Sequence, residues 1–279
     1  MGAAVGQCLA DGGHEVLWVP AGRSPATGAR AEAAGLTAAD GLADLVRRAD
    51  VIFSICPPHA AVGVARDVAG FGGVYVDANA ISPATAREVA AIVEGGGATY
   101  VDGGIIGTPP IAPGFIRFYL SGGSGGSGDF GGSGGSGDQA GKVRALFDGT
   151  PVDVRLVDRD GVGDVGQVGD VGQVGDVGSA SAVKMAYASW TKGSAALLLA
   201  ARALARAEGV EDALLAEWAG SQPGLQEWWA RSADAAAKKG WRWVGEMEEI
   251  AAAMGANGLP EGFHLAAAEM YRRNTGPAR

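Results

Sequence analysis

The chain has 279 residues, of which 47% are hydrophobic and 48 are glycine, so it is long enough for two domains with a substantial core. Its formal charge of −9 argues against a nucleic-acid partner or an anionic membrane, because both favour a basic protein surface. With only Cys8, Cys56 and three histidines in unrelated contexts, we expect no disulfide framework and no metal site, and a reducing cytoplasm fits best.

Helices and strands alternate through the first half of the chain. Helices are predicted over residues 3–11, 42–48, 60–69, 82–93 and 139–147, and strands over residues 15–19, 50–55, 74–77, 99–102 and 115–120. Continuous apolar strands separated by helices indicate a parallel sheet that is covered on both faces. Ligands bind such sheets at the carboxyl ends of the strands. We therefore expect chemistry at residues 23–24, 54–58, 77–79 and 102–107.

Two glycine-rich stretches depart from this pattern. Residues 122–129 recur as residues 131–138 and have the composition of a flexible Gly/Ser linker, which defines an insert over residues 121–138. Residues 163–178 repeat Asp-Val-Gly-Gln-Val-Gly without proline, which excludes a collagen helix, and without the Asp spacing of a calcium-binding repeat. Tandem expansion of the coding DNA, or engineering, explains both stretches.

A long apolar helix is predicted from residue 179 to about residue 208, with Ser179 as its N-cap. One face carries the small side chains of Ala182, Ala186, Ser189 and Gly193, and a neighbouring face carries Lys184, Tyr187, Ala188 and Thr191. Lys184 either extends its ammonium group to the surface or loses hydration, which disfavours its charged form and suits proton transfer.

The remainder of the chain is predicted to be helical over residues 210–218, 225–239, 241–254 and 262–273, with breaks at Gly or Pro. Five of the seven tryptophans fall here, and core or interface packing explains them better than a ligand cage. Glu246, Glu248 and Glu249 are predicted to form a solvated helix face, and His264 is assigned a structural role.

Five motifs, taken in their order along the chain, resemble the 6-phosphogluconate/β-hydroxyacid dehydrogenase family. They lie in residues 1–16, 54–58, 76–83, 100–104 and 178–184. The stretch Asp-Gly-Gly-Ile-Ile over residues 102–106 also resembles the related imine reductases. The resemblance implies a Rossmann-type, doubly wound α/β domain over residues 1–160, a Gly-rich linker over residues 161–178, and an all-α domain over residues 179–279. In this family the helical domain contributes to the substrate site and forms a homodimer.

The resemblance also implies roles for individual residues. Lys184 matches the catalytic lysine, which moves a proton to or from the substrate oxygen as hydride passes to or from the nicotinamide. Arg23 and Ser24 follow the second strand, where a cation suits the 2′-phosphate of NADPH rather than the free ribose of NAD. The other implied cofactor contacts are Gly2 at the end of the glycine loop, Cys56, Pro57 and Pro58 against the nicotinamide ribose, and Asn79 against the nicotinamide.

Local sequence alone leaves alternatives open for several of these residues. Arg23 could be a solvated charge, residues 56–58 could be a strand-ending turn, and Asn79 could form an Asx turn. Tyr187 is either a second proton donor for catalysis or a core aromatic.

The substrate loop of the family is implied at Gly104, Ile105, Ile106 and Gly107, but it departs from the family pattern. The serine of the family's Ser-Gly-Gly is replaced by Ile106, and the asparagine one turn after the lysine is replaced by Ala188. Both changes disfavour 6-phosphogluconate or a simple hydroxyacid. A small carbonyl, hydroxyl or imine compound is expected instead.

The start of the chain departs from the family as well. Met1 and Gly2 correspond to the end of a G-x-G-x-x-G loop, whose first two glycines and preceding strand are absent. We therefore expect an N-terminally truncated chain, most simply one with its start codon assigned to an internal methionine. Without that strand the sheet should fall into two parts with unpaired edges. The alternative function is a truncated, non-catalytic paralogue that serves only as a dimeric helical module.

Overall fold

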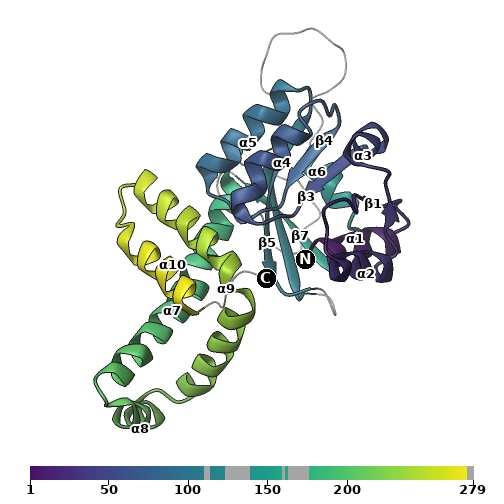
Figure 1. The fold of residues 1–279 in the computed structure, drawn as a ribbon. Coiled ribbons are helices and arrows are strands. Elements are labelled where there is room, and N and C mark those ends of the chain that lie inside the picture. Colours follow the sequence, from purple (N-terminus) through teal and green to yellow (C-terminus); the bar gives the residue numbers. More distant parts are fainter. Residues whose placement is uncertain (110–113, 123–138, 159–160, 163–175, 275–279) are drawn as a thin grey trace. The chain divides into compact units, whose positions relative to one another are not determined.

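The computed structural model describes residues 1–109, 114–122, 139–158, 161–162 and 176–274 (Figure 1). Residues 123–138 of the predicted Gly/Ser insert and most of the Asp-Val-Gly-Gln-Val-Gly repeat lie outside the described residues. Ser121 and Gly122, which were assigned to the insert, are instead the last residues of a strand. The chain separates into two units, Met1–Lys184 and Met185–Arg279. Within the described residues, no helix combines the length and apolar character needed to cross a membrane.

The first unit alternates helices and strands, as predicted. In chain order its elements are α1 (Gly2–Asp11), β1 (Leu17–Trp18), α2 (Pro25–Ala33), β2 (Thr37–Ala38), α3 (Leu42–Arg48), β3 (Val51–Ser54), the 3₁₀ turn η1 (Pro58–Ala60), α4 (Ala61–Asp67), β4 (Val74–Asp77), α5 (Pro83–Gly95), β5 (Thr99–Gly107), β6 (Ile116–Gly122), α6 (Gln139–Ala145), β7 (Val152–Asp158) and β8 (Gly161–Val162).

Two helices of this unit begin with the same local signal, a serine followed by a proline. Ser24 and Ser82 each accept a hydrogen bond on the side-chain hydroxyl from the backbone N–H three residues later, and a proline occupies the first helical position. The hydroxyl satisfies a donor that has no partner inside the helix, and the fixed φ of proline suits the first turn. The predicted start of α5 is therefore confirmed.

The strands form two separate sheets. β1 and β2 pair in parallel, and the second sheet has the order β3-β4-β5-β6-β7-β8. Among the described strands none joins the two sheets, and this separation into two parts was predicted. The six-stranded sheet is mixed, because β5 pairs antiparallel with β6 and β7 pairs antiparallel with β8.

The strand predicted to end at residue 102 in fact continues to Gly107. It does so because β6 pairs with it from Val101 to Gly107. The predicted end of this strand at residue 102 is therefore wrong.

The six-stranded sheet carries helices on both faces, which confirms an α/β, Rossmann-type unit. Val5, Cys8 and Leu9 of α1 pack with Ala140 and Val143 of α6 in one core cluster. A second cluster joins α4 and α5 to the opposite face. Its buried members include Ile52, Ala61, Ala65, Tyr75, Val89, Val93 and Tyr100.

The second unit is helical. It contains most of α7 (Ser179–Ala207), together with α8 (Glu211–Ser221), α9 (Leu225–Ala256) and α10 (Gly262–Asn274). The predicted break at Gly240 is wrong, because α9 passes through this buried glycine without interruption. A glycine inside a helix costs only about 1 kcal/mol relative to alanine, which the packing of a 32-residue helix can offset.

Packing in the second unit corrects one further expectation. Glu246 is not solvated: it is 5% exposed and forms an ion pair with Lys192, whose ammonium group lies 5.6 Å from the ring centre of Trp243. His264 is buried, and its Nε2 lies 2.9 Å from the hydroxyl of Ser189, as suits the structural role assigned to it.

Candidate functional site

Four buried polar side chains on four neighbouring strands form one row across the sheet. The strand registers pair Ser54 with Asp77, Asp77 with Asp102, and Asp102 with Ser121. These four residues, here called the polar row, are each at most 4% exposed. Buried polar groups are costly unless they are hydrogen-bonded. The polar row is therefore expected to form hydrogen bonds with groups from other parts of the chain.

At one end of the polar row, Asn79 binds the turn that follows β3. Its Nδ2 donates to Ser54 Oγ over 2.9 Å, and its Oδ1 accepts from the backbone N–H of Cys56 over 2.5 Å. The backbone N–H of Asn79 donates to Asp77 Oδ1 over 2.9 Å, which is an Asx turn made by the aspartate. Asn79 is 2% exposed, so its amide shapes the turn at Cys56.

Cys56 is partly buried in this turn, and Pro58, two residues later, is buried. Burial raises the pKa of the Cys56 thiol to about 11, and the positive charge of Arg23 opposes that shift. That the ends of β1 and β3 converge on one site stays a prediction.

Arg23 stands directly before the first turn of α2. Ser24 caps that helix, and its hydroxyl lies 3.1 Å from Thr27 Oγ1, to which Arg30 Nη2 donates over 2.9 Å. Two arginines and the positive end of a helix dipole thus lie on one exposed corner, which is a favourable place for an anion. Thr27 and Arg30 were missed by the sequence analysis, although their three-residue spacing after Ser24 was a usable signal.

The first turn of α1 lies beside the same strand ends. A Cβ placed on Gly2 would lie 3.9 Å from the Cβ of Ile55, so the start of α1 faces the end of β3. Its N-cap residue, Met1, makes no side-chain capping hydrogen bond.

At the other end of the polar row, Asp102 and Ser121 bind the start of α7. Asp102 accepts hydrogen bonds from the backbone N–H groups of Gly178 and Ser181 over 3.0 and 2.9 Å and from Ser181 Oγ over 2.6 Å. Ser121 Oγ accepts from the backbone N–H of Ala180 over 2.9 Å and donates to Asp102 Oδ2 over 3.0 Å. Burial raises the pKa of Asp102, and these hydrogen bonds oppose the rise.

Ser179, the predicted N-cap, is instead the first residue of α7. Asp102 accepts the N–H groups at the start of α7 instead. The sequence could not predict this role, because the aspartate lies 76 residues before Gly178.

Lys184 lies over Gly104 of β5. A Cβ on Gly104 would be 3.1 Å from the Lys184 Cβ and 2.7 Å from the Ala180 carbonyl oxygen, so only glycine admits α7 this close. Ile106 shares this face of β5 and packs with Ala180 and Val183 of α7.

The structure does not bring the other predicted substrate residues together with Lys184. Ile105 points to the opposite face of the sheet, into the core with α1 and α6. Gly107 has a φ of 124°, and a Cβ there would lie 2.0 Å from the Phe115 carbonyl oxygen. Glycine is therefore needed at this position for the backbone of β5 to pass close to Phe115.

Tyr187 is 44% exposed, so it is not a core aromatic of its unit. The neighbouring Ala188 is 1% exposed. The proton-donor alternative for Tyr187 stays a prediction.

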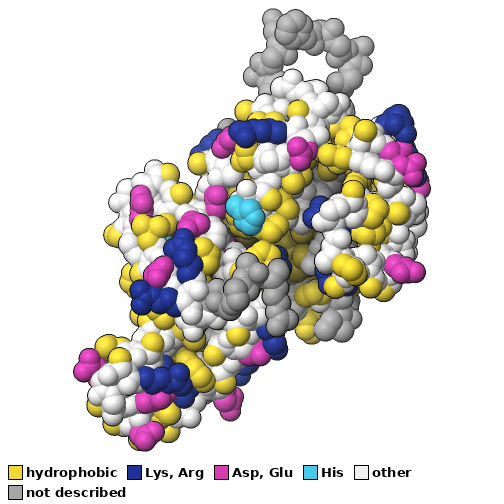
Figure 2. All heavy atoms as spheres, in the orientation of Figure 1, with side chains coloured by type: hydrophobic (Ala, Val, Ile, Leu, Met, Phe, Trp, Pro, Cys, Tyr) yellow, Lys and Arg dark blue, Asp and Glu magenta, His cyan; other side chains and the backbone are white. Residues whose placement is uncertain are grey.

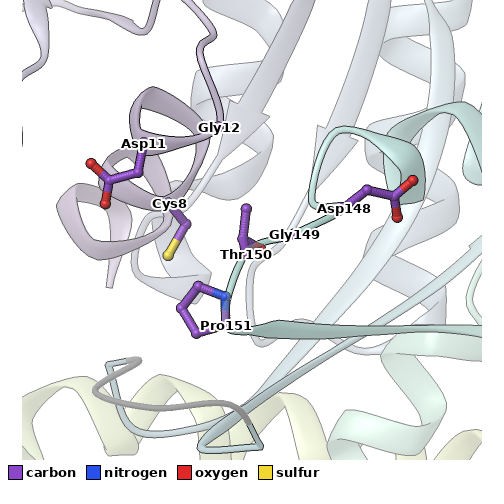
Figure 3. A pocket seen from close by; sticks show the side chains of 7 residues that line it. All are labelled: Cys8, Asp11, Gly12, Asp148, Gly149, Thr150 and Pro151. Carbon is purple, nitrogen blue, oxygen red and sulfur yellow. The ribbon is translucent and has the colours of Figure 1, made fainter.

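A hollow of about 260 Å³ lies elsewhere on the first unit, at the C-terminal end of α1 (Figure 3). It is lined by Cys8, Asp11, Gly12, Asp148, Gly149, Thr150 and Pro151, none of which belongs to the strand-end site. Among the residues that the structure describes, no group of three or more His, Cys, Asp or Glu side chains could hold a metal ion.

Two family models match the chain. Residues 1–124 match the NAD binding domain of 6-phosphogluconate dehydrogenase, and residues 205–274 match a domain of unknown function, DUF1932. No curated protein matches the chain.

Solved structures resemble the chain over nearly its whole length. The conserved protein MTH1747, of unknown function and described as structurally similar to 3-hydroxyacid dehydrogenases, is 25% identical with a TM-score of 0.60, covering 98% of this chain and 92% of that one. Mycobacterium tuberculosis 3-hydroxyisobutyrate dehydrogenase with L-serine is 19% identical with a TM-score of 0.61, covering 98% and 89%. The reductive aminase of Aspergillus terreus with NADPH and ethyl-5-oxohexanoate is 22% identical with a TM-score of 0.51, covering 98% and 88%.

Proposed function

We propose that this chain, which belongs to the 6-phosphogluconate dehydrogenase-like NAD(P)-dependent oxidoreductases, uses NADPH to reduce a small carbonyl or imine compound or to catalyse the reverse oxidation. The observation that carries the proposal is that the start of α1 at Gly2 faces Ile55 at the end of β3, next to the turn at Cys56. Lys184 lies over Gly104, two residues along β5 from the same polar row.

The residues at the strand ends fit a phosphorylated dinucleotide. The start of α1 at Gly2 suits the pyrophosphate, because helix N-termini bind phosphate through their backbone N–H groups and dipole. Arg23, with Arg30 and the start of α2, suits a 2′-phosphate, since guanidinium groups form charge-assisted hydrogen bonds with phosphate oxygens. This cationic corner supports NADPH over NADH.

When bound, a reduced nicotinamide supplies a hydride to the substrate carbon. In our proposal Lys184 Nζ gives its proton to the oxygen or nitrogen that gains electron density, and takes it back in the oxidative direction. Cys56, Pro57 and Pro58 form the turn against which the nicotinamide ribose lies, and Asn79 holds that turn in place.

The substrate wall is apolar on the Lys184 face of β5, where Ile106 packs against α7. An apolar wall favours ketones and cyclic imines, since it would leave the polar groups of polyhydroxylated or phosphorylated compounds without partners.

We assign the enzyme to the cytoplasm. Cys8 and Cys56 are both free thiols, which suits a reducing compartment.

A substrate screen tests this function. Ketoacids, ketones and cyclic imines are each added to enzyme and NADPH, and oxidation of NADPH is followed by absorbance. We expect turnover with at least one apolar ketone or imine, and a weaker response with hydroxyacids in the oxidative direction. Turnover that prefers phosphorylated sugar acids would contradict the assigned substrate class.

We also propose that the protein is a homodimer formed along α7. Trp190, Leu197 and Leu204 are 71%, 55% and 63% exposed and recur every seven residues, which places them in one stripe of the helix. Large exposed apolar side chains at regular helical spacing are typical of a helix-helix interface. Figure 2 shows apolar side chains between charged ones on the visible face of this helical unit.

Charge placed in the stripe should separate the two copies. Leu197→Asp with Leu204→Asp is expected to raise the dimer dissociation constant by about 100-fold or more, because both side chains would otherwise be desolvated at the interface. Sedimentation velocity measures the monomer fraction. Leu259→Asp is the control, since Leu259 is 52% exposed but lies between α9 and α10. A wild-type protein that sediments as a monomer at micromolar concentration would rule out this interface.

A further inference from the structure

We infer that Asp102 and Ser121 are positioning residues that set where Lys184 stands over the sheet. This inference rests on the proposed function. Neither residue touches substrate or cofactor in our account; both act through the first turn of α7.

The first argument is the hydrogen bonding of the helix start. The first N–H groups of a helix have no partner within it. Here three of the four backbone donors from residue 178 to residue 181 find partners on the sheet, because Gly178 and Ser181 donate to Asp102 and Ala180 donates to Ser121. The carboxylate also lies at the positive end of the helix dipole. The sheet therefore fixes the start of α7 both along its axis and in rotation.

The second argument is burial. Asp102, Ser121, Ala180 and Ser181 have no exposed surface. Water cannot replace a lost hydrogen bond there without the helix moving, and an unsatisfied buried donor is expensive. A change at Asp102 should therefore displace the first turn of α7.

The third argument is the short path from this anchor to Lys184. Ser181 and Lys184 are one helical turn apart, and Asp102 and Gly104 are two residues apart on the same face of β5. Gly104 contacts Ala180 and Lys184, so the anchor at Asp102 and the lysine rest on one short piece of strand. A shift of the first turn moves Lys184 by a comparable amount.

The fourth argument is that the polar row continues to the turn at Cys56. Asp77 is the register partner of Asp102, and it holds the backbone of Asn79, whose side chain holds Cys56. The turn assigned to the nicotinamide ribose and the helix that carries Lys184 are thus fixed to neighbouring strands at one level of the sheet. A misplacement of about 1 Å at such a site can cost about 100-fold in rate.

The test compares Asp102→Asn with Val101→Ala. Both residues are fully buried and adjacent on β5, but Val101 packs in the core with α1 and α6, whereas Asp102 accepts the hydrogen bonds from the start of α7. The control therefore disturbs the same strand without touching the anchor. Ser121→Ala is the second variant, because it removes the Ala180 bond and keeps the carboxylate should Asp102→Asn fail to fold.

The readout is the position of Lys184 itself. The chain has five lysines, so reductive ¹³C-dimethylation gives few NMR signals, and Lys184→Arg identifies the one from Lys184. Addition of NADPH is expected to shift that signal in wild type and in Val101→Ala. In Asp102→Asn the shift should fall by at least about half, with NADPH affinity within about 3-fold of wild type and kcat lower by about 100-fold. Ser121→Ala should lower kcat by about 10-fold.

The outcomes separate this inference from the proposed function. If NADPH does not bind wild type, the proposed function fails, and the inference fails with it. If NADPH binds and the anchor variants keep the wild-type Lys184 signal and kcat, only the positioning role is wrong. An equal loss in Val101→Ala would likewise overturn it, because the loss would then follow the stability of β5 and not the anchor.

Discussion

Replacement of Lys184 by methionine is expected to lower kcat by about 10² to 10⁴-fold while NADPH affinity stays within a few-fold of wild type. Methionine has a similar length and no proton to give, so the variant removes the proposed acid–base group with little change in volume. Lys184 lies directly over Gly104 at the strand ends, whereas the cationic corner at Arg23 belongs to another part of the site. The substitution should therefore lower the rate of catalysis without weakening cofactor binding.

Single-turnover oxidation of bound NADPH measures this effect, because it isolates the chemical step from product release. Lys238→Met is the matched control, since Lys238 is an exposed lysine of α9 paired with Asp234 in the preceding turn. A Lys184→Met variant that turns over as fast as wild type would remove this lysine from the mechanism. A variant with unchanged kcat and much weaker NADPH binding would assign it to the cofactor instead.

Arg23→Glu is expected to weaken NADPH binding by about 100-fold or more and to leave NADH binding within a few-fold. Hydrogen bonds to charged groups contribute about 1.5–3 kcal/mol each, and the substituted carboxylate also repels a 2′-phosphate. NADH lacks that phosphate, so its affinity should depend little on residue 23. The ratio of the two dissociation constants is the quantity to measure.

Arg66→Glu provides the control for charge reversal, because Arg66 is an exposed arginine of α4 in the same unit. If Arg23→Glu weakens NADH as much as NADPH, the arginine acts on the shared part of the nucleotide or on folding. If neither affinity changes, Arg23 is a solvated surface charge, which is the alternative that the sequence left open.

Local signals predicted much of this fold. The Ser-Pro pair at residues 82–83 located the start of α5, and apolar runs located β3 and β4 to within a residue at each end. Such features depend on neighbours along the chain, as caps and periodicity do.

Features that depend on pairing between distant segments could not be predicted in the same way. Nothing near Asp102 in sequence reveals that Ser121 is its register partner, or that it binds the start of α7. The extension of β5 to Gly107 depends likewise on β6. Gly240 gave a misleading local signal, because the packing of α9 outweighs the cost of one glycine.

The central claim is that the strand ends around Gly2, Arg23 and Cys56 bind NADPH, and titration of NADPH fluorescence against wild-type protein tests it most directly. We expect saturable binding, tighter than that of NADH measured by competition. No binding of either nucleotide up to millimolar concentration would contradict the account and favour a non-catalytic helical module.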